Sequence, residues 1–196
     1  MNDQILGAGR YTFRAFDRFG NAVPLWCENR VGRWLRRTLR LSARWHKCLY
    51  VPHVLGQWGM ECIEPNLLVT AGKALVASRI NGAGSEAAVT FLEVGTGTTA
   101  ADAADTLLET PILAATDAAF NRQAATVSRE TTTTTNDTAR LDTTFGPAGT
   151  THAVTECGAF NNTTENTVDM LARSVFTVKN IDSGGSLQVI YDFPVS

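Results

Sequence analysis

Regular alternation of apolar and polar residues in the last third of the chain constrains the fold more than any other feature. Three stretches show it, 154–160, 170–178 and 186–193. An Asn/Thr-rich turn separates the first two, and the turn 182–185, Asp-Ser-Gly-Gly, precedes the third. Strands with one buried face have this period of two, and Gly, Asn, Asp and Ser are common turn residues. The pattern predicts consecutive strands of an antiparallel β-sandwich.

The composition agrees with a β-rich globular domain. Charged residues make up only 18% of the 196 residues, which is far from the composition of disordered chains. This length allows one core with a small appendage. The net charge of −2 gives little self-repulsion and no strong attraction to nucleic acid or to anionic membranes. We therefore expect a homo-oligomer, a trimer being one such form, with no membrane partner.

Further elements follow from local patterns along the chain. Residues 66–79 place Leu and Ala on one helical face, which predicts one packed helix. Additional strands are predicted at 10–19, 23–26, 88–94, 120–135 and 137–145. The fourth of these ends in a run of five threonines, 131–135, whose β-branched side chains favour strands. The expected fold is mainly β, an antiparallel β-sandwich of jelly-roll type formed by residues 1–24 and 63–196.

Residues 25–62 differ from the rest and are predicted to form an insertion. They contain seven basic residues against two acidic ones, a local net charge of +5 that leaves −7 for the remainder. All four tryptophans and three of the four cysteines lie here. Basic residues at steps of three and four predict an amphipathic helix over about 29–50, ended by Pro52.

The basic helix has three possible roles. It can be a solvated face, a protein interface or a nucleic-acid contact, because arginine and tryptophan serve both of the last two. We take the protein interface as the functional hypothesis. Its candidate residues are Trp26, Arg30, Arg33, Trp34, Arg37, Arg40, Arg44, Trp45, Lys47 and Trp58.

No catalytic or metal-binding pattern accompanies these elements, so we expect no enzyme activity and no cofactor. His152 and Cys157 lie five residues apart, which places them on opposite faces of a regular strand. The spacing of the histidines and cysteines within 46–62 is not that of a zinc site, and we expect the cysteines to be reduced thiols. Four acidic residues are predicted to form a solvated acidic loop: Glu93, Asp102, Asp105 and Glu109.

The chain is expected to be made in the cytoplasm. No apolar run approaches the roughly 20 residues that span a bilayer. The first nine residues lack the basic region and long apolar core of a signal peptide.

Several segments, in this order along the chain, resemble small virion proteins of tailed bacteriophages. They are 17–21 (Asp-Arg-Phe-Gly-Asn), 66–73 (Asn-Leu-Leu-Val-Thr-Ala-Gly-Lys), 91–100 (Phe-Leu-Glu-Val-Gly-Thr-Gly-Thr-Thr-Ala), 105–108 (Asp-Thr-Leu-Leu), 154–161 (Val-Thr-Glu-Cys-Gly-Ala-Phe-Asn), 171–176 (Leu-Ala-Arg-Ser-Val-Phe), Asn180 and 186–189 (Ser-Leu-Gln-Val). The resemblance covers about 10–22 and 64–196 and leaves out the insertion. Such proteins are tail-fibre, decoration or other structural components.

The resemblance implies an oligomeric, non-enzymatic component of the virion. A capsid decoration (cement) protein that binds the major capsid protein, or another virion protein, through the insertion is the first hypothesis. A tail or tail-fibre protein that contacts the host is an alternative. A nucleic-acid-binding protein acting through the basic helix is a second alternative, although the weak net charge argues against nucleic acid as partner.

Overall fold

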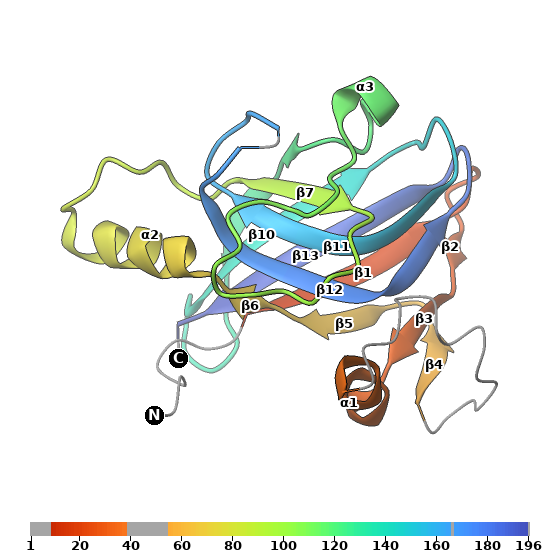
Figure 1. The fold of residues 1–196 in the computed structure, drawn as a ribbon, viewed down its shortest axis with the longest axis horizontal. Coiled ribbons are helices and arrows are strands. Elements are labelled where there is room, and N and C mark those ends of the chain that lie inside the picture. The colour runs from red at the N-terminus through yellow and green to blue at the C-terminus, as the bar shows by residue number, and fades with distance from the viewer. Residues whose placement is uncertain (1–8, 39–54, 166, 196) are drawn as a thin grey trace.

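The protein is a sandwich of two antiparallel sheets, as the computed structural model of residues 9–38, 55–165 and 167–195 shows (Figure 1). Strands from the first third of the chain and from residues 126–194 form one sheet, and strands from residues 67–181 form the other. The prediction of a mainly β, antiparallel sandwich with one packed helix is confirmed.

The first sheet has the strand order β2-β1-β13-β10-β9. β1 pairs along its whole length with β13, and its other edge is shared by β5 and β2. The hairpin of β9 and β10 completes the far side of the sheet. The bounds are β1 Arg10–Phe16, β2 Ala22–Val23, β5 Cys62–Pro65, β9 Thr126–Glu130, β10 Thr138–Phe145 and β13 Ser186–Pro194.

The second sheet has the order β6-β12-β11-β7-β8. Its centre is the long pair of β11 and β12, whose register shifts at two places. The bounds are β6 Leu67–Leu68, β7 Phe91–Gly95, β8 Gln123–Ala124, β11 His152–Phe160 and β12 Met170–Ile181.

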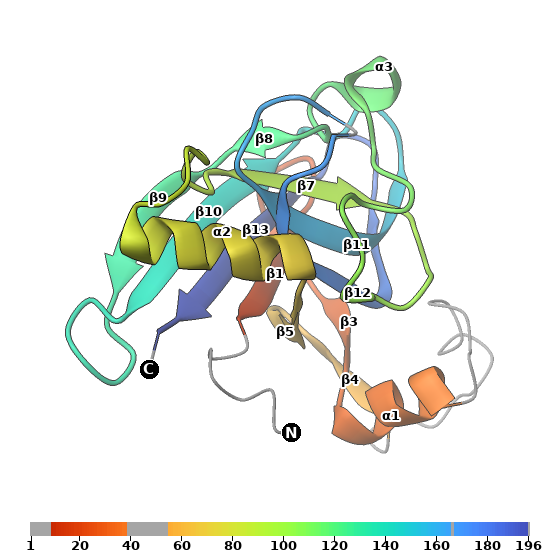
Figure 2. The same ribbon diagram turned by 60° about the vertical axis from the view of Figure 1, so that its left-hand side comes forward.

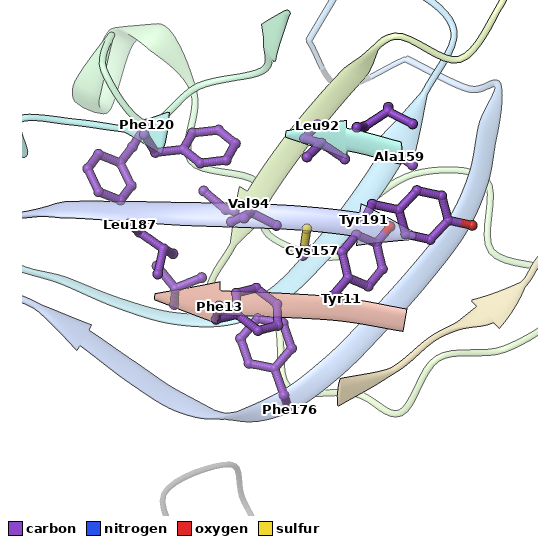
Figure 3. Close-up of a cluster of buried hydrophobic side chains, with 14 of the residues drawn as sticks. Tyr11, Phe13, Leu92, Val94, Phe120, Cys157, Ala159, Phe176, Leu187 and Tyr191 are labelled. Atoms are coloured by element: carbon purple, nitrogen blue, oxygen red, sulfur yellow. The ribbon is translucent and has the colours of Figure 1, made fainter. Parts of the chain in front are cut away.

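The core lies between the inner faces of the two sheets and is rich in aromatic rings (Figure 3). The rings of Tyr11 and Tyr191, on neighbouring strands, lie 4.6 Å apart between centroids. Phe13 of the first sheet meets Phe176 of the second at 4.4 Å. These ring pairs bury large apolar surfaces and fix how the sheets face each other. Cys157 lies in the same cluster (Figure 3).

The outer face of the second sheet is also covered, because β12 is buried without interruption from Met170 to Lys179. The loop 96–110 lies over part of it, and the helix α2, Thr70–Asn81, packs against β12 with Leu75 in the main core. Figure 2 shows α2 running across the sandwich. Gly72 permits this approach, since a Cβ there would lie 2.0 Å from the Leu171 carbonyl oxygen. A further short helix, α3, spans Ala114–Asp117.

The helix predicted at 66–79 begins later and ends later than expected. Leu67 and Leu68 form β6 instead, pairing with Arg173 and Ala172 of β12. Tertiary pairing therefore outweighs the helical period at the start of the segment, and α2 begins at Thr70.

The prediction of a strand through the threonine run is wrong. The run follows β9 and forms a loop around the carboxylate of Asp137, which accepts hydrogen bonds from the backbone N–H groups of Thr132, Thr133 and Thr134 at 2.7–2.8 Å. These local bonds compete with strand pairing. They hold the pKa of Asp137 far below its usual range.

Candidate interaction surface

The described part of the insertion, residues 25–38 and 55–62, includes a two-stranded ribbon beside the first sheet (Figure 1). β3, Leu25–Glu28, and β4, Gly56–Gly59, pair antiparallel and place Trp26 opposite Trp58. The two indole rings meet edge to face at 5.7 Å. This pairing makes Trp26 part of the packing of the ribbon.

A disulfide joins Cys27 of β3 to Cys62 of β5. The expectation that both are reduced thiols is therefore wrong. The two cysteines are 35 residues apart, and no local pattern indicated that the chain folds back on itself here. Since β5 also pairs with β1, the disulfide ties the ribbon to the edge of the sandwich.

We expect loss of this disulfide to destabilise the protein. Closing a loop of 35 residues restricts the unfolded chain and contributes about 3 to 4 kcal/mol in the chain-entropy model. The double variant Cys27→Ala/Cys62→Ala should show this loss in urea unfolding, and a reductant should cause a comparable loss in the native chain. Addition of reductant to the double variant is the control and should change nothing further.

The helix α1, Arg30–Thr38, packs against the ribbon and forms the described part of the predicted basic helix. The side chain of Asn29 caps its first turn by accepting a hydrogen bond from the Gly32 N–H at 2.8 Å. A Cβ at position 32 would lie 2.1 Å from the Leu55 carbonyl oxygen, so only glycine allows the helix this close to the ribbon. Residues 39–50 of the predicted helix lie outside the described residues.

A buried charge cluster, here called the root cluster, attaches the insertion to the second sheet. It consists of Lys179, Glu64 and Arg33. The ammonium group of Lys179 donates to the Trp26 carbonyl oxygen at 2.6 Å and lies 3.4 Å from a carboxylate oxygen of Glu64. The other oxygen of Glu64 is 2.8 Å from the guanidinium of Arg33. Because Lys179 and Glu64 are almost fully buried, the cluster fixes the base of the insertion.

Large apolar side chains remain exposed around α1 and β5. Trp34 is 64% exposed and Ile63 is 50% exposed. They share a hollow of about 480 Å³, here called the basic hollow, which is lined by Gly9, Arg10, Arg30, Arg33, Trp34, Ile63 and Pro65. Exposed tryptophan beside arginine is typical of the centres of protein interfaces.

The structure separates the candidate residues into three groups. Arg30, Arg33 and Trp34 line the basic hollow, and Trp58 is exposed on the ribbon. Trp26 is 8% exposed, so its ring packs within the fold. The remaining candidates carry side chains outside the described residues: Arg37, Arg40, Arg44, Trp45 and Lys47. The sequence interpretation missed Arg10 and Ile63, which only the pairing of β1 with β5 brings to this surface.

Sequence reasoning also missed a buried ion cluster at Arg173 on the outer face of the second sheet. Its guanidinium contacts Glu156 at 2.8 Å and Asp105 at 2.7 Å. Burial opposes its charge, but the hydrogen bond that it donates to Asp105 and the neighbouring carboxylates outweigh this and raise the pKa of Arg173. The available signal was the arginine in the strand segment Met170–Val178, which has no other charged residue.

The prediction of a solvated acidic loop is wrong for Glu93, whereas Asp105 is partly exposed and Glu109 is exposed, each with an ion pair. Glu93 is buried and pairs with Arg122 at 2.9 Å. Asp105 and Glu109 lie around Arg173, at 2.7 and 3.7 Å. Only Asp102 remains on the surface without an ion pair among the described residues.

His152 and Cys157 do not form a catalytic pair. The His152 ring nitrogen Nε2 lies 2.7 Å from the carboxylate of Asp117 and the ring stacks near Phe120. Cys157 lies in the core, where burial raises the pKa of its thiol well above the ordinary value. This thiol is therefore uncharged and a poor nucleophile.

The parts of the chain that the structure describes hold no group of three or more His, Cys, Asp or Glu side chains arranged to bind a metal ion. No helix in these ranges has the length and apolar character needed to cross a membrane. The chain matches no protein-family model, no curated protein and no solved structure. Its function must therefore be inferred from its own residues.

Proposed function

We propose that this chain is a non-enzymatic structural protein of a tailed-bacteriophage virion, most simply a capsid decoration protein that attaches to the assembled head through its insertion. The exposed Trp34 and Ile63, beside arginines on a rooted insertion, carry this proposal. Exposed apolar side chains of this kind are unfavourable in water and are typical of a surface that a partner covers. Many copies on one particle would convert modest individual contacts into firm attachment.

The segments that resemble phage virion proteins support the same proposal. Residues 91–100, 154–161 and 171–176 contribute to the neighbouring strands β7, β11 and β12. Their charged residues Glu93, Glu156 and Arg173 form the buried pairs of the outer face. The shared pattern thus lies in the scaffold, whereas the insertion supplies the attachment particular to this chain.

Immuno-electron microscopy of intact particles tests the proposal. Gold-labelled antibodies against the chain should decorate the heads of the phage whose genome encodes it, and mass spectrometry of purified particles should detect the chain in many copies. Label confined to tails would replace the decoration role with the tail role. Absence of the chain from purified particles would overturn the virion proposal altogether.

A further inference from the structure

The basic hollow combines three arginines, here called its rim, with three apolar residues, here called its floor. The arginines are Arg10, Arg30 and Arg33, and the apolar residues are Trp34, Ile63 and Pro65. The hollow lies where α1 meets the edge strand β5, so its two walls come from the insertion and the sandwich. Since the root cluster and the disulfide fix the insertion to that edge, the walls are held relative to each other.

Carboxylates of the protein only partly satisfy this positive charge. Arg10 lies 3.4 Å from Asp192, but Asp192 already accepts two shorter hydrogen bonds, of 2.7 and 3.0 Å, from Arg140. The side chain of Arg10 stays 49% exposed. Arg10 is therefore a weakly held guanidinium that can take another carboxylate.

Arg33 and Arg30 also differ in how closely carboxylates of the protein pair with them. Arg33 is engaged by the buried Glu64 at 2.8 Å, and Glu64 also faces Lys179. The side chain of Arg30 is exposed and makes no hydrogen bond or ion pair with any part of the chain that the structure describes. Two arginines of the hollow, Arg10 and Arg30, therefore keep N–H groups that can donate to another carboxylate.

We infer that the basic hollow docks an acidic peptide segment of a partner protein, with an apolar side chain on the floor and carboxylates on the rim. Guanidinium groups hold carboxylates through paired, charge-assisted hydrogen bonds, and Trp34 and Ile63 give the apolar side chain a surface to cover. The inference deepens the attachment role and rests on it for the partner being a virion protein.

The segment would bind through its side chains and not as an added strand. Pro65 has no N–H to offer at the edge of β5, and the Ile63 carbonyl oxygen already faces the guanidinium of Arg33 at 3.4 Å. Strand addition requires a free row of such groups. Specificity therefore depends on Arg10, Arg30 and Trp34.

A nucleic-acid strand fits the described surface less well than a peptide. A strand carries one phosphate per nucleotide and needs cations along a track. Two residues before Ile63 in the chain, Glu61 is 41% exposed in its side chain and pairs with Arg14 at 2.6 Å. Its carboxylate interrupts such a track, whereas a peptide brings only one or two charges to the rim.

Fluorescence anisotropy with synthetic probes tests this inference on the whole purified chain. The probes are a labelled heptapeptide with glutamates on both sides of a central phenylalanine, the same peptide with glutamines, and a labelled single-stranded oligothymidine. We expect the acidic peptide to bind at least about tenfold more tightly than the glutamine peptide at low salt, as charge complementarity predicts. Arg30→Glu and Trp34→Ala should each weaken its binding by about tenfold or more.

The matched control is Arg129→Glu, which reverses an exposed arginine on β9 at the other edge of the same sheet. It should leave peptide binding unchanged, and all variants should retain the native circular dichroism because the changed side chains are exposed. Equal binding of the two peptides, no effect of Arg30→Glu, or tighter binding of the oligonucleotide would each overturn the inference. Microscopy of the particle is independent of these results, so the virion proposal can fail or stand separately.

Discussion

Replacing Arg173 with methionine is expected to lower the free energy of unfolding by about 3 to 5 kcal/mol, the range found when one partner of a buried ion pair is removed. Arg173 is 2% exposed and its guanidinium contacts Glu156, which is fully buried, at 2.8 and 3.0 Å. Methionine fills a similar volume but leaves the Glu156 carboxylate without its cation. Urea unfolding of the variant measures the loss.

The structural damage should be greatest in the loop 96–110. Glu156 accepts hydrogen bonds from the N–H groups of Gly97 at 3.0 Å and Thr110 at 2.7 Å, and Arg173 holds Asp105 of the same loop at 2.7 Å. Hydrogen exchange at Gly97 and Thr110 should therefore accelerate before that of β13.

Two further variants decide whether charge is the cause. Arg129→Met changes an exposed arginine on β9 and should cost less than about 0.5 kcal/mol. Adding Glu156→Gln to Arg173→Met should recover part of the loss, since it removes the unpaired buried charge. A stability of Arg173→Met equal to that of Arg129→Met would contradict this account of the outer face.

The strands of the last third were predictable because each has one face in the core. The alternating stretches 170–178 and 186–193 correspond to β12, Met170–Ile181, and β13, Ser186–Pro194. Alternation reports local burial, however, and says nothing of which segment covers the other face. Alternation is typical of a strand with one polar face, whereas the loop 96–110 covers the outer face of β12 through Arg173.

The candidate surface was predictable only where its residues follow one local pattern. Helical spacing identified Arg30, Arg33 and Trp34, which share one local segment. Arg10 and Ile63 come together because β1 pairs with β5, which places Arg10 opposite Pro65 and Thr12 opposite Ile63. These partners are more than fifty residues apart in the chain. Such long-range pairing also brings Cys27 to Cys62, and no local pattern could reveal it.

Replacing Lys179 with methionine is expected to loosen the attachment of the insertion to the sandwich, although the disulfide still joins β3 to β5. The buried ammonium group donates to the Trp26 carbonyl oxygen at 2.6 Å and faces Glu64, so its loss removes a cation from the buried Glu64 carboxylate and one donor from the carbonyl. Because Arg33 still pairs with Glu64, we expect a loss near the lower end of the buried-pair range, about 3 kcal/mol.

Limited proteolysis measures directly how far the attachment of the insertion is loosened. In Lys179→Met a protease should cut within residues 25–62 much faster than in the native chain, while a fragment containing β10 to β13 stays protected, since local opening exposes the insertion first. Lys73→Met is the matched control, because Lys73 lies exposed on α2 and makes no contact with the root cluster. If both variants are cut at the native rate, Lys179 does not hold the insertion. If cleavage accelerates throughout the sandwich, Lys179 stabilises the whole fold and the insertion does not open independently of it.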